Sequence, residues 1–169
     1  MFERDGMVSV QESDFDPGAE ITALGGERTD VGGVATFIGL VRDANDGNGV
    51  TAMTLEHYPG MTERALGEIV AQARARWSLL AVRVIHRVGR LVPGDRIVFV
   101  GVAAAHRGEA FAACEFIMDY LKTRAPFWKC EETPAGARWV DARDSDDTAA
   151  GRWTGDRVPA VGDVGEKTG

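Results

Sequence analysis

The sequence predicts an α+β protein, in which pairs of neighbouring strands alternate with two longer helices. An alternating pattern predicts a strand at 50–58, and apolar residues at helical spacing predict a helix from 59 to 77. Short apolar, β-branched runs such as 96–104 predict buried strands. The resulting order is strand, strand, helix, strand, strand, helix and hairpin, which differs from the order expected of a doubly wound sheet.

The first part of the chain is expected to hold two strands. A short strand is predicted at 8–11, followed by a turn and then a short helix or an extended piece. Residues 31–42 read as a buried strand because they are apolar and β-branched, and Gly32 and Gly33 let another backbone come close. The Asn, Asp and Gly residues of 43–49 indicate a flexible loop.

The remaining elements follow the first long helix in order. Strands 79–89 and 96–104 flank a Pro-Gly-Asp turn at 93–95. A second helix covers 108–124 and should be stopped by Pro126, because a proline disfavours helix at the preceding residue. The segments FWKCEET and ARWVDA, joined through PAGA, predict a final hairpin.

Charge is distributed unevenly along the 169 residues, whose net charge is -7. Residues 1–30 carry 2 basic and 8 acidic groups, and residues 144–169 carry 3 basic and 6 acidic groups, whereas the middle of the chain carries 14 basic and 12 acidic groups. The acidic, Gly-rich and aperiodic segment 144–169 is expected to be a disordered tail, which leaves 1–143 as one domain. The overall charge argues against nucleic-acid binding, but the middle of the chain admits an anionic small molecule.

Composition also bears on compartment and cofactors. The first thirty residues lack the basic start and apolar stretch of a signal peptide, and no apolar run of 18 or more residues could span a membrane, so a cytoplasmic protein is expected. Cys114 and Cys130 form no disulfide framework, and no Cys and His spacing suggests a metal. No glycine pattern of the dinucleotide-binding type follows a strand, so no nucleotide cofactor is indicated.

The stretch LKTRAPFWKCEE contains two of only three lysines in a chain that has 16 arginines. Lys122 and Lys129 lie seven residues apart, around an Ala-Pro turn. Arginine keeps its proton near neutral pH, whereas the surroundings of a lysine can tune it to exchange one. The pair therefore suggests acid–base chemistry, with two solvated surface charges as the plainer alternative.

Further cationic groups are expected at the ends of predicted elements. Arg42 follows a buried strand, and His106 and Arg107 lie where another strand meets the N-terminus of the second helix, a place that favours anions. Together with Lys122 and Lys129 they would form a cationic pocket suited to a phosphate. Arg42 can instead simply close its strand, and His106 can be a neighbour of the helix cap.

Other polar and aromatic residues have plainer interpretations. His57 and His86 lie on predicted strands and are expected to be structural or to face a partner, and Trp128 fits a core aromatic. Cys130 follows Lys129, whose charge would favour a reactive thiolate. Neighbours on a strand face opposite sides, however, so we interpret Cys130 as inert.

Five fragments, taken in order, resemble the large, catalytic subunits of molybdopterin synthase, the MoaE family. They are FIGLVRD, LEHYPGM, HRVGRLVPGD, VGVAAAHRGEAF and LKTRAPFWKCEE, and the resemblance covers roughly 8–143. It implies an α/β hammerhead fold with a small antiparallel subdomain. It also implies a dimer of large subunits, with a small ubiquitin-like subunit at each end to complete a heterotetramer.

The resemblance further implies a reaction. The small subunit ends in a Gly-Gly thiocarboxylate that enters the large subunit's pocket and gives sulfur to cyclic pyranopterin monophosphate (precursor Z). Two transfers build the dithiolene of molybdopterin, and the cyclic phosphate opens. No separate cofactor is implied.

Site residues are carried over by matching motifs. Lys129 is the first candidate for the catalytic residue and Lys122 the second. The implied substrate contacts are Leu40, Val41, Arg42, His106, Arg107, Lys122, Lys129, Cys130, Glu131 and, across the dimer, Arg143. Cys130 departs from the family pattern, which commonly has a second basic residue there, and this puts the contacts of that position in doubt.

Two other functions remain open at the level of sequence. The chain can be a scaffold that binds a ubiquitin-like tail or a phosphorylated pterin without turnover, although such a site could use arginine in place of both lysines. It can also be a phosphate-ester hydrolase, although the sequence has no metal cluster or evident Ser-His-Asp set.

Overall fold

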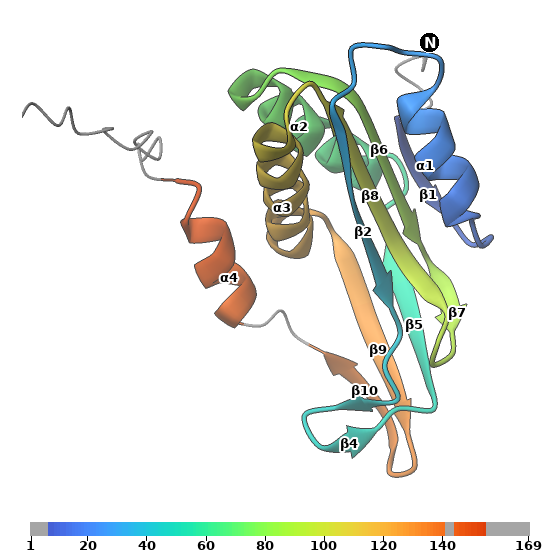
Figure 1. Cartoon of the computed structure of the whole chain (residues 1–169). Helices are drawn as coiled ribbons and strands as arrows, with labels where there is room; N and C mark the ends of the chain where they lie inside the picture. The colour runs from blue at the N-terminus through green and yellow to red at the C-terminus, as the bar shows by residue number, and fades with distance from the viewer. Residues whose placement is uncertain (1–6, 141–143, 155–169) are drawn as a thin grey trace, which may run out of the picture.

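The structure is a computed structural model that describes residues 7–140 and 144–154, without the side chains of residues 144 and 145. Its architecture is α+β, as predicted: two four-stranded sheets follow one another along the long axis of the molecule, and helices cover the larger one (Figure 1). The second, smaller sheet agrees with the antiparallel subdomain that the resemblance implies.

The larger sheet has the strand order β1-β6-β8-β2. Strand β1 (Val8–Gln11) runs parallel to β6 (Leu79–Arg87), whereas β8 (Arg96–Ala104) pairs antiparallel with both β6 and β2 (Gly33–Leu40). All four strands were anticipated from the sequence, β2 and β8 because they are short apolar, β-branched runs.

The smaller sheet has the order β10-β9-β5-β7, and its strands are all antiparallel. The strands are β5 (Ala52–His57), β7 (Gly89–Leu91), β9 (Phe127–Thr133) and β10 (Gly136–Val140). The expected flexible loop at 43–49 instead contains a small hairpin of β3 (Ala44–Asn45) and β4 (Asn48–Gly49).

Three helices pack on the larger sheet. Helix α1 (Pro17–Gly25) lies on one face, and α2 (Met61–Arg76) and α3 (Arg107–Arg124) lie on the other (Figure 1). Strand β8 supplies both faces with apolar side chains, because successive residues of a strand point to opposite sides. Val98 and Val100 pack in the cluster under α2 and α3, whereas Phe99 packs in the cluster under α1.

The helices begin and end at residues that satisfy their terminal groups. The Asp16 carboxylate accepts hydrogen bonds from two backbone N–H groups in the first turn of α1. At α2, the Glu63 carboxylate accepts a hydrogen bond of 2.6 Å from the N–H of Gly60. Helix α3 ends at Arg124, just before the Ala-Pro turn that Pro126 imposes.

Strand β2 differs from its prediction as a buried strand. It lies at an edge of the larger sheet, and Ala35 is its one buried residue, whereas Val34, Phe37 and Leu40 are exposed. An apolar, β-branched run indicates a strand, but it does not reveal whether a helix of the same chain covers that strand.

The acidic segment after residue 143 also differs from its prediction. Residues 144–151 form helix α4 (Asp144–Gly151), which packs on α3. Trp153 explains this: its ring meets Trp77 and Phe116 edge to face, with ring centroids 5.6 and 5.5 Å away, and its indole N–H donates to Asp119 Oδ2 at 2.7 Å. Disorder is therefore wrong for 144–154, while 155–169 lie outside the described residues.

The close backbone approach expected at the glycine pair occurs at Gly32. A Cβ atom on Gly32 would collide with the backbone carbonyl of Ala105, whereas one on Gly33 would be 3.7 Å from Arg107 Cα, an ordinary contact. We expect Gly32→Ala to lower the free energy of unfolding by about 2 kcal/mol, because a backbone group cannot move aside as a side chain can. Urea unfolding measures the change, and Gly33→Ala is the matched control. Equal effects of the two variants would contradict the close approach.

Candidate functional site

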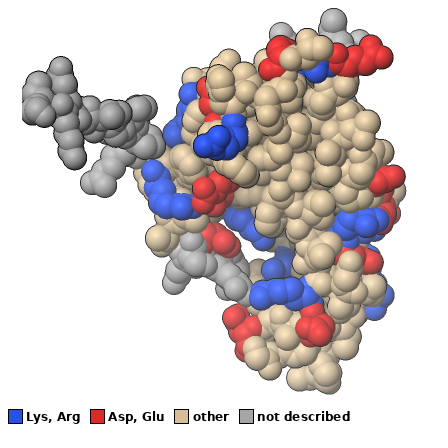
Figure 2. Space-filling model, in the orientation of Figure 1, with Lys and Arg blue, Asp and Glu red and all other residues tan. Residues whose placement is uncertain are grey.

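A cavity of about 620 Å³ lies where the larger sheet meets the smaller one. Its wall includes the end of β2, the β3–β4 hairpin, β5, the end of α3 and β9, with further residues from β6, β8, β10 and α4. In the space-filling view, Lys and Arg side chains gather around the hollow between the upper body and the lower lobe (Figure 2). The size suits a small-molecule ligand.

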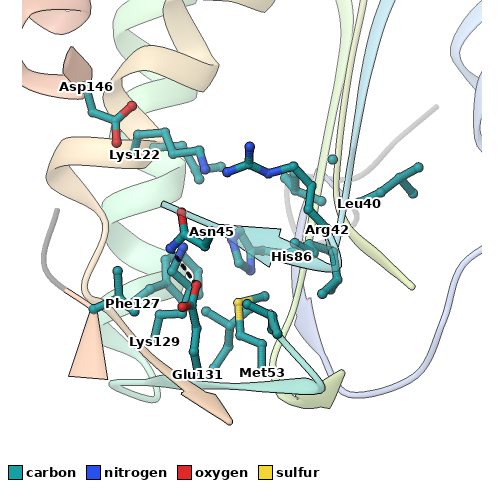
Figure 3. A pocket seen from close by; sticks show the side chains of 18 of the residues that line it. Leu40, Arg42, Asn45, Met53, His86, Lys122, Phe127, Lys129, Glu131 and Asp146 are labelled. Carbon is teal, nitrogen blue, oxygen red and sulfur yellow. Dashed lines mark hydrogen bonds between the residues drawn. The ribbon is translucent and has the colours of Figure 1, made fainter. Parts of the chain in front are cut away.

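Three of the predicted cations line this cavity. Arg42 follows β2, Lys122 lies in the last turn of α3, and Lys129 lies on β9. The side chains of Arg42 and Lys122 extend toward one another across the cavity (Figure 3). The seven-residue spacing of the two lysines thus spans the turn from helix to strand, which places both on one cavity.

The segment that leads from β2 into the cavity is held by backbone hydrogen bonds. The N–H of Val41 donates to the carbonyl of Asp95 at 2.9 Å, and the N–H of Gly94 donates to the carbonyl of Val41 at 2.9 Å. Val41 is buried and Leu40 is exposed at the rim, and both line the cavity next to Arg42. The Pro-Gly-Asp turn therefore fixes the backbone from which the Arg42 side chain extends.

Glu131 is a buried carboxylate in the wall, and its side chain is 4% exposed. Asn45 Nδ2 donates to Glu131 Oε1 at 2.7 Å, and Arg138 NH2 donates to Glu131 Oε2 at 3.1 Å. Arg138 stands directly opposite Glu131 in the β9–β10 register. Both oxygens of the carboxylate thus have a partner, so the acid is held in place and its charge is compensated.

The two cysteines have the positions expected of inert thiols. Lys129 and Glu131 line the cavity, whereas the intervening Cys130 does not, as the alternation of a strand requires. Cys114 is buried in the core, and desolvation raises the pKa of its thiol to about 11.

His106 and Arg107 do not line this cavity of the single chain, so their predicted substrate contact stays a prediction. They lie at the N-terminal end of α3, whereas Lys122 lies near its C-terminal end. Fifteen residues of helix separate Arg107 from Lys122 by about 22 Å. Arg143 lies outside the described residues, and its role stays a prediction.

Sequence reasoning missed three polar residues of the wall: Asn45, His86 and Asp146. Asn45 lay in a presumed loop, and Asp146 lay in a presumed disordered tail, so neither was expected near the site. Figure 3 shows Asp146 beside the side chain of Lys122. An acidic group from α4 thereby faces an otherwise cationic end of the cavity.

His86 was expected to be structural, and its contacts show how firmly it is held. Its ring stacks on Phe127 with centroids 3.9 Å apart, and Nδ1 lies 2.8 Å from the carbonyl oxygen of Arg87. Desolvation lowers the pKa of His86 to about 4; the hydrogen bond to Arg87 opposes this shift, while the charges of Lys122 and His57 add to it. The ring is therefore neutral at physiological pH.

Within the described ranges, no group of three or more His, Cys, Asp or Glu side chains could hold a metal ion. No helix among the same residues has the length and apolar character needed to cross a membrane.

The chain matches known proteins along most of its length. A model of the MoaE protein family matches residues 10–124. The chain belongs to the MoaE family. It is 65% identical over 146 residues to a protein of Ralstonia nicotianae named molybdopterin synthase catalytic subunit, covering 86% of this chain and 83% of that protein. A protein of the same name from Pseudomonas aeruginosa is 59% identical, covering 86% and 97%.

A solved structure agrees with the sequence comparison. The molybdopterin biosynthesis MoaE protein from Burkholderia ambifaria superposes with a TM-score of 0.75 at 55% identity, covering 88% of this chain and 97% of that one. The MoaE family match ends at residue 124, so it includes Arg42, His86 and Lys122 but not Lys129.

The neutrality of His86 makes the stability of this MoaE chain depend on pH. The unfolded chain takes up a proton on this residue below about pH 6.5, whereas the folded chain does so only near pH 4, so stability falls as pH drops through that window. At about pH 5.5 we expect a loss on the order of 1 kcal/mol relative to pH 7. Urea unfolding at both pH values measures it. In His86→Phe this part of the loss should vanish, and an identical loss would contradict the assignment.

We expect Trp153 to hold α4, and with it Asp146, against the body of the protein. We expect Trp153→Ala to lower the free energy of unfolding by about 2 kcal/mol and to speed amide hydrogen exchange in α4, because two ring contacts and a hydrogen bond are lost. Trp139→Ala, at an exposed position, is the control. Unchanged exchange in α4 would show that other contacts hold the helix.

Proposed function

We propose that this chain is the catalytic subunit of a molybdopterin synthase, which transfers sulfur to cyclic pyranopterin monophosphate. The observation that carries the proposal is the meeting of Arg42, Lys122 and Lys129 on one cavity, in a chain 65% identical to a protein of that name. In each transfer a C–S bond forms on the substrate. The oxygen that leaves the substrate passes to the donor, whose thiocarboxylate becomes a carboxylate. The exchange therefore needs no oxidant or reductant.

The cationic end of the cavity suits the substrate's phosphate. A guanidinium binds a phosphate through two parallel hydrogen bonds, and an ammonium adds a point charge. Arg42 and Lys122 extend toward the same space from opposite walls (Figure 3). A phosphate held between them fixes the orientation of the carbons that receive sulfur.

The chemistry also requires proton transfers, because hydroxyl and thiol groups are exchanged at those carbons. A lysine can donate and accept a proton where an arginine cannot. Lys129 is our first choice for this role because β9 directs it into the cavity beside the fixed Glu131 carboxylate, and Lys122 is the second. Leu40, Val41 and Glu131 shape the wall around the substrate.

The sulfur donor in this proposal is a small ubiquitin-like subunit whose C-terminal Gly-Gly thiocarboxylate enters the cavity. The two relatives are each named a catalytic subunit, which fits a chain that acts with a further subunit. We place both subunits in the cytoplasm, where the assembly is a homodimer of this chain with two small subunits.

The exposed edge of the larger sheet supports the homodimer. Phe37 of β2 and Phe111 of α3 are apolar, and each is more than a third exposed. A solvent-facing set of large apolar side chains on one strand and its neighbouring helix favours burial against another protein surface. His106 and Arg107 begin the helix that carries Phe111, so we assign them to this contact region, with Arg143 as a further group across the dimer.

A reconstitution tests the function. We expect the purified chain, mixed with a thiocarboxylated small subunit and cyclic pyranopterin monophosphate, to form molybdopterin, measured as its oxidised fluorescent derivative. Lys129→Ala and Lys129→Arg should both lower the rate by at least about 100-fold, because neither side chain can exchange a proton at neutral pH. Arg64→Ala, at an exposed position on α2, is the control.

Each other outcome has a distinct meaning. Activity retained in Lys129→Arg reduces Lys129 to a positive charge and moves the proton transfer to Lys122. Binding of the small subunit's tail without product, in the wild type, identifies a scaffold. Phosphate-ester hydrolysis in the absence of any small subunit identifies a hydrolase.

A further inference from the structure

We propose that His86 binds the substrate as a fixed, neutral hydrogen-bond acceptor, with Nε2 accepting from an N–H group of the substrate's pterin ring. Nothing in the sulfur-transfer chemistry assigns a role to this residue. The identity of the ligand rests on the proposed function, whereas the tautomer of the ring follows from its contact with Arg87.

The contact of Nδ1 fixes which nitrogen carries the proton. Nδ1 lies 2.8 Å from the carbonyl oxygen of Arg87, and a carbonyl oxygen can only accept a hydrogen bond. Nδ1 therefore carries the hydrogen. In a neutral imidazole the other nitrogen, Nε2, then has a free lone pair and accepts.

The packing of the ring directs this lone pair to the cavity. One face of the ring is stacked on Phe127, at an interplanar angle of 20°, and both residues line the cavity. In the described part of the chain Nε2 has no hydrogen-bond partner. Arg138 Nε is the side-chain atom there that is both unpartnered and fully buried, so His86 Nε2, which is also unpartnered, is not fully buried. In Figure 3 the ring lies in the middle of the view, between Arg42 and Lys129.

An acceptor at this place supplies what the three cations of the wall lack. Arg42, Lys122 and Lys129 can donate to a phosphate, but a reduced pterin ring also presents several N–H donors. The oxygens of Glu131 already accept from Asn45 and Arg138. A neutral nitrogen can remain unpaired beside the cations, whereas a second free carboxylate there would pair with a lysine.

Binding tests the inference without any turnover. The full-length chain, labelled with ¹⁵N in histidine, should show one protonated and one unprotonated nitrogen for His86, with Nδ1 as the protonated one. Adding cyclic pyranopterin monophosphate, without the small subunit, should shift the Nε2 resonance. A protonated Nε2 in the free protein, or an unmoved Nε2 resonance with substrate bound, overturns the proposal.

Three variants separate substrate binding from a structural role. His86→Asn keeps a donor where Nδ1 bonds the Arg87 carbonyl, His86→Gln puts an amide at the distance of Nε2, and His86→Phe keeps the ring stacked on Phe127. We expect the KM for the pterin to rise about tenfold in the Asn and Phe variants, with a smaller change in kcat, and less in the Gln variant. A KM unchanged in all folded variants overturns the proposal.

The two readouts also distinguish this inference from the function on which it rests. If the wild type forms no product but substrate shifts the Nε2 resonance, the proposed reaction fails and the binding role of His86 stands. If product forms and the resonance does not move, the reverse holds.

Discussion

The geometry of the cavity depends on the reversal of the chain at Pro126. Proline lacks a backbone N–H and restricts the residue before it, so α3 ends at Arg124 and β9 begins at Phe127. The helix belongs to the layer that covers the larger sheet, and the strand belongs to the smaller sheet. Lys122 and Lys129 therefore reach one cavity from two different layers, which is how two side chains of a short segment come to enclose a ligand.

The cavity also depends on a buried carboxylate in its wall whose negative charge is compensated. Glu131 is buried, and an unpaired buried charge would be strongly destabilising. Asn45 from the β3–β4 hairpin and Arg138 from β10 occupy its two oxygens. The same contacts tie the hairpin and the sheet edge together, so the network that neutralises the acid also shapes one side of the cavity.

Helix α4 adds a component that the composition of the segment conceals. Arg152 pairs with Glu115 and Asp119, and Trp153 packs between Trp77 and Phe116. These contacts anchor the end of α4 on α3, and the other end carries Asp146 to the cavity. An acidic segment thus sets the local charge beside Lys122, although its composition is that of a solvated tail.

The sequence by itself determined the α+β class, the two longest helices, the longer strands and the two lysines, because periodicity, turn residues and a proline act locally. Tertiary structure alone decided the rest. It separated His106 and Arg107 from the cavity by the length of α3, exposed the apolar edge strand β2, and brought Asn45, His86 and Asp146 to the wall. The physical reason is that such positions depend on packing between layers distant in sequence: a polar residue in a loop, a strand or an acidic tail looks the same in the sequence whether it faces solvent or a cavity.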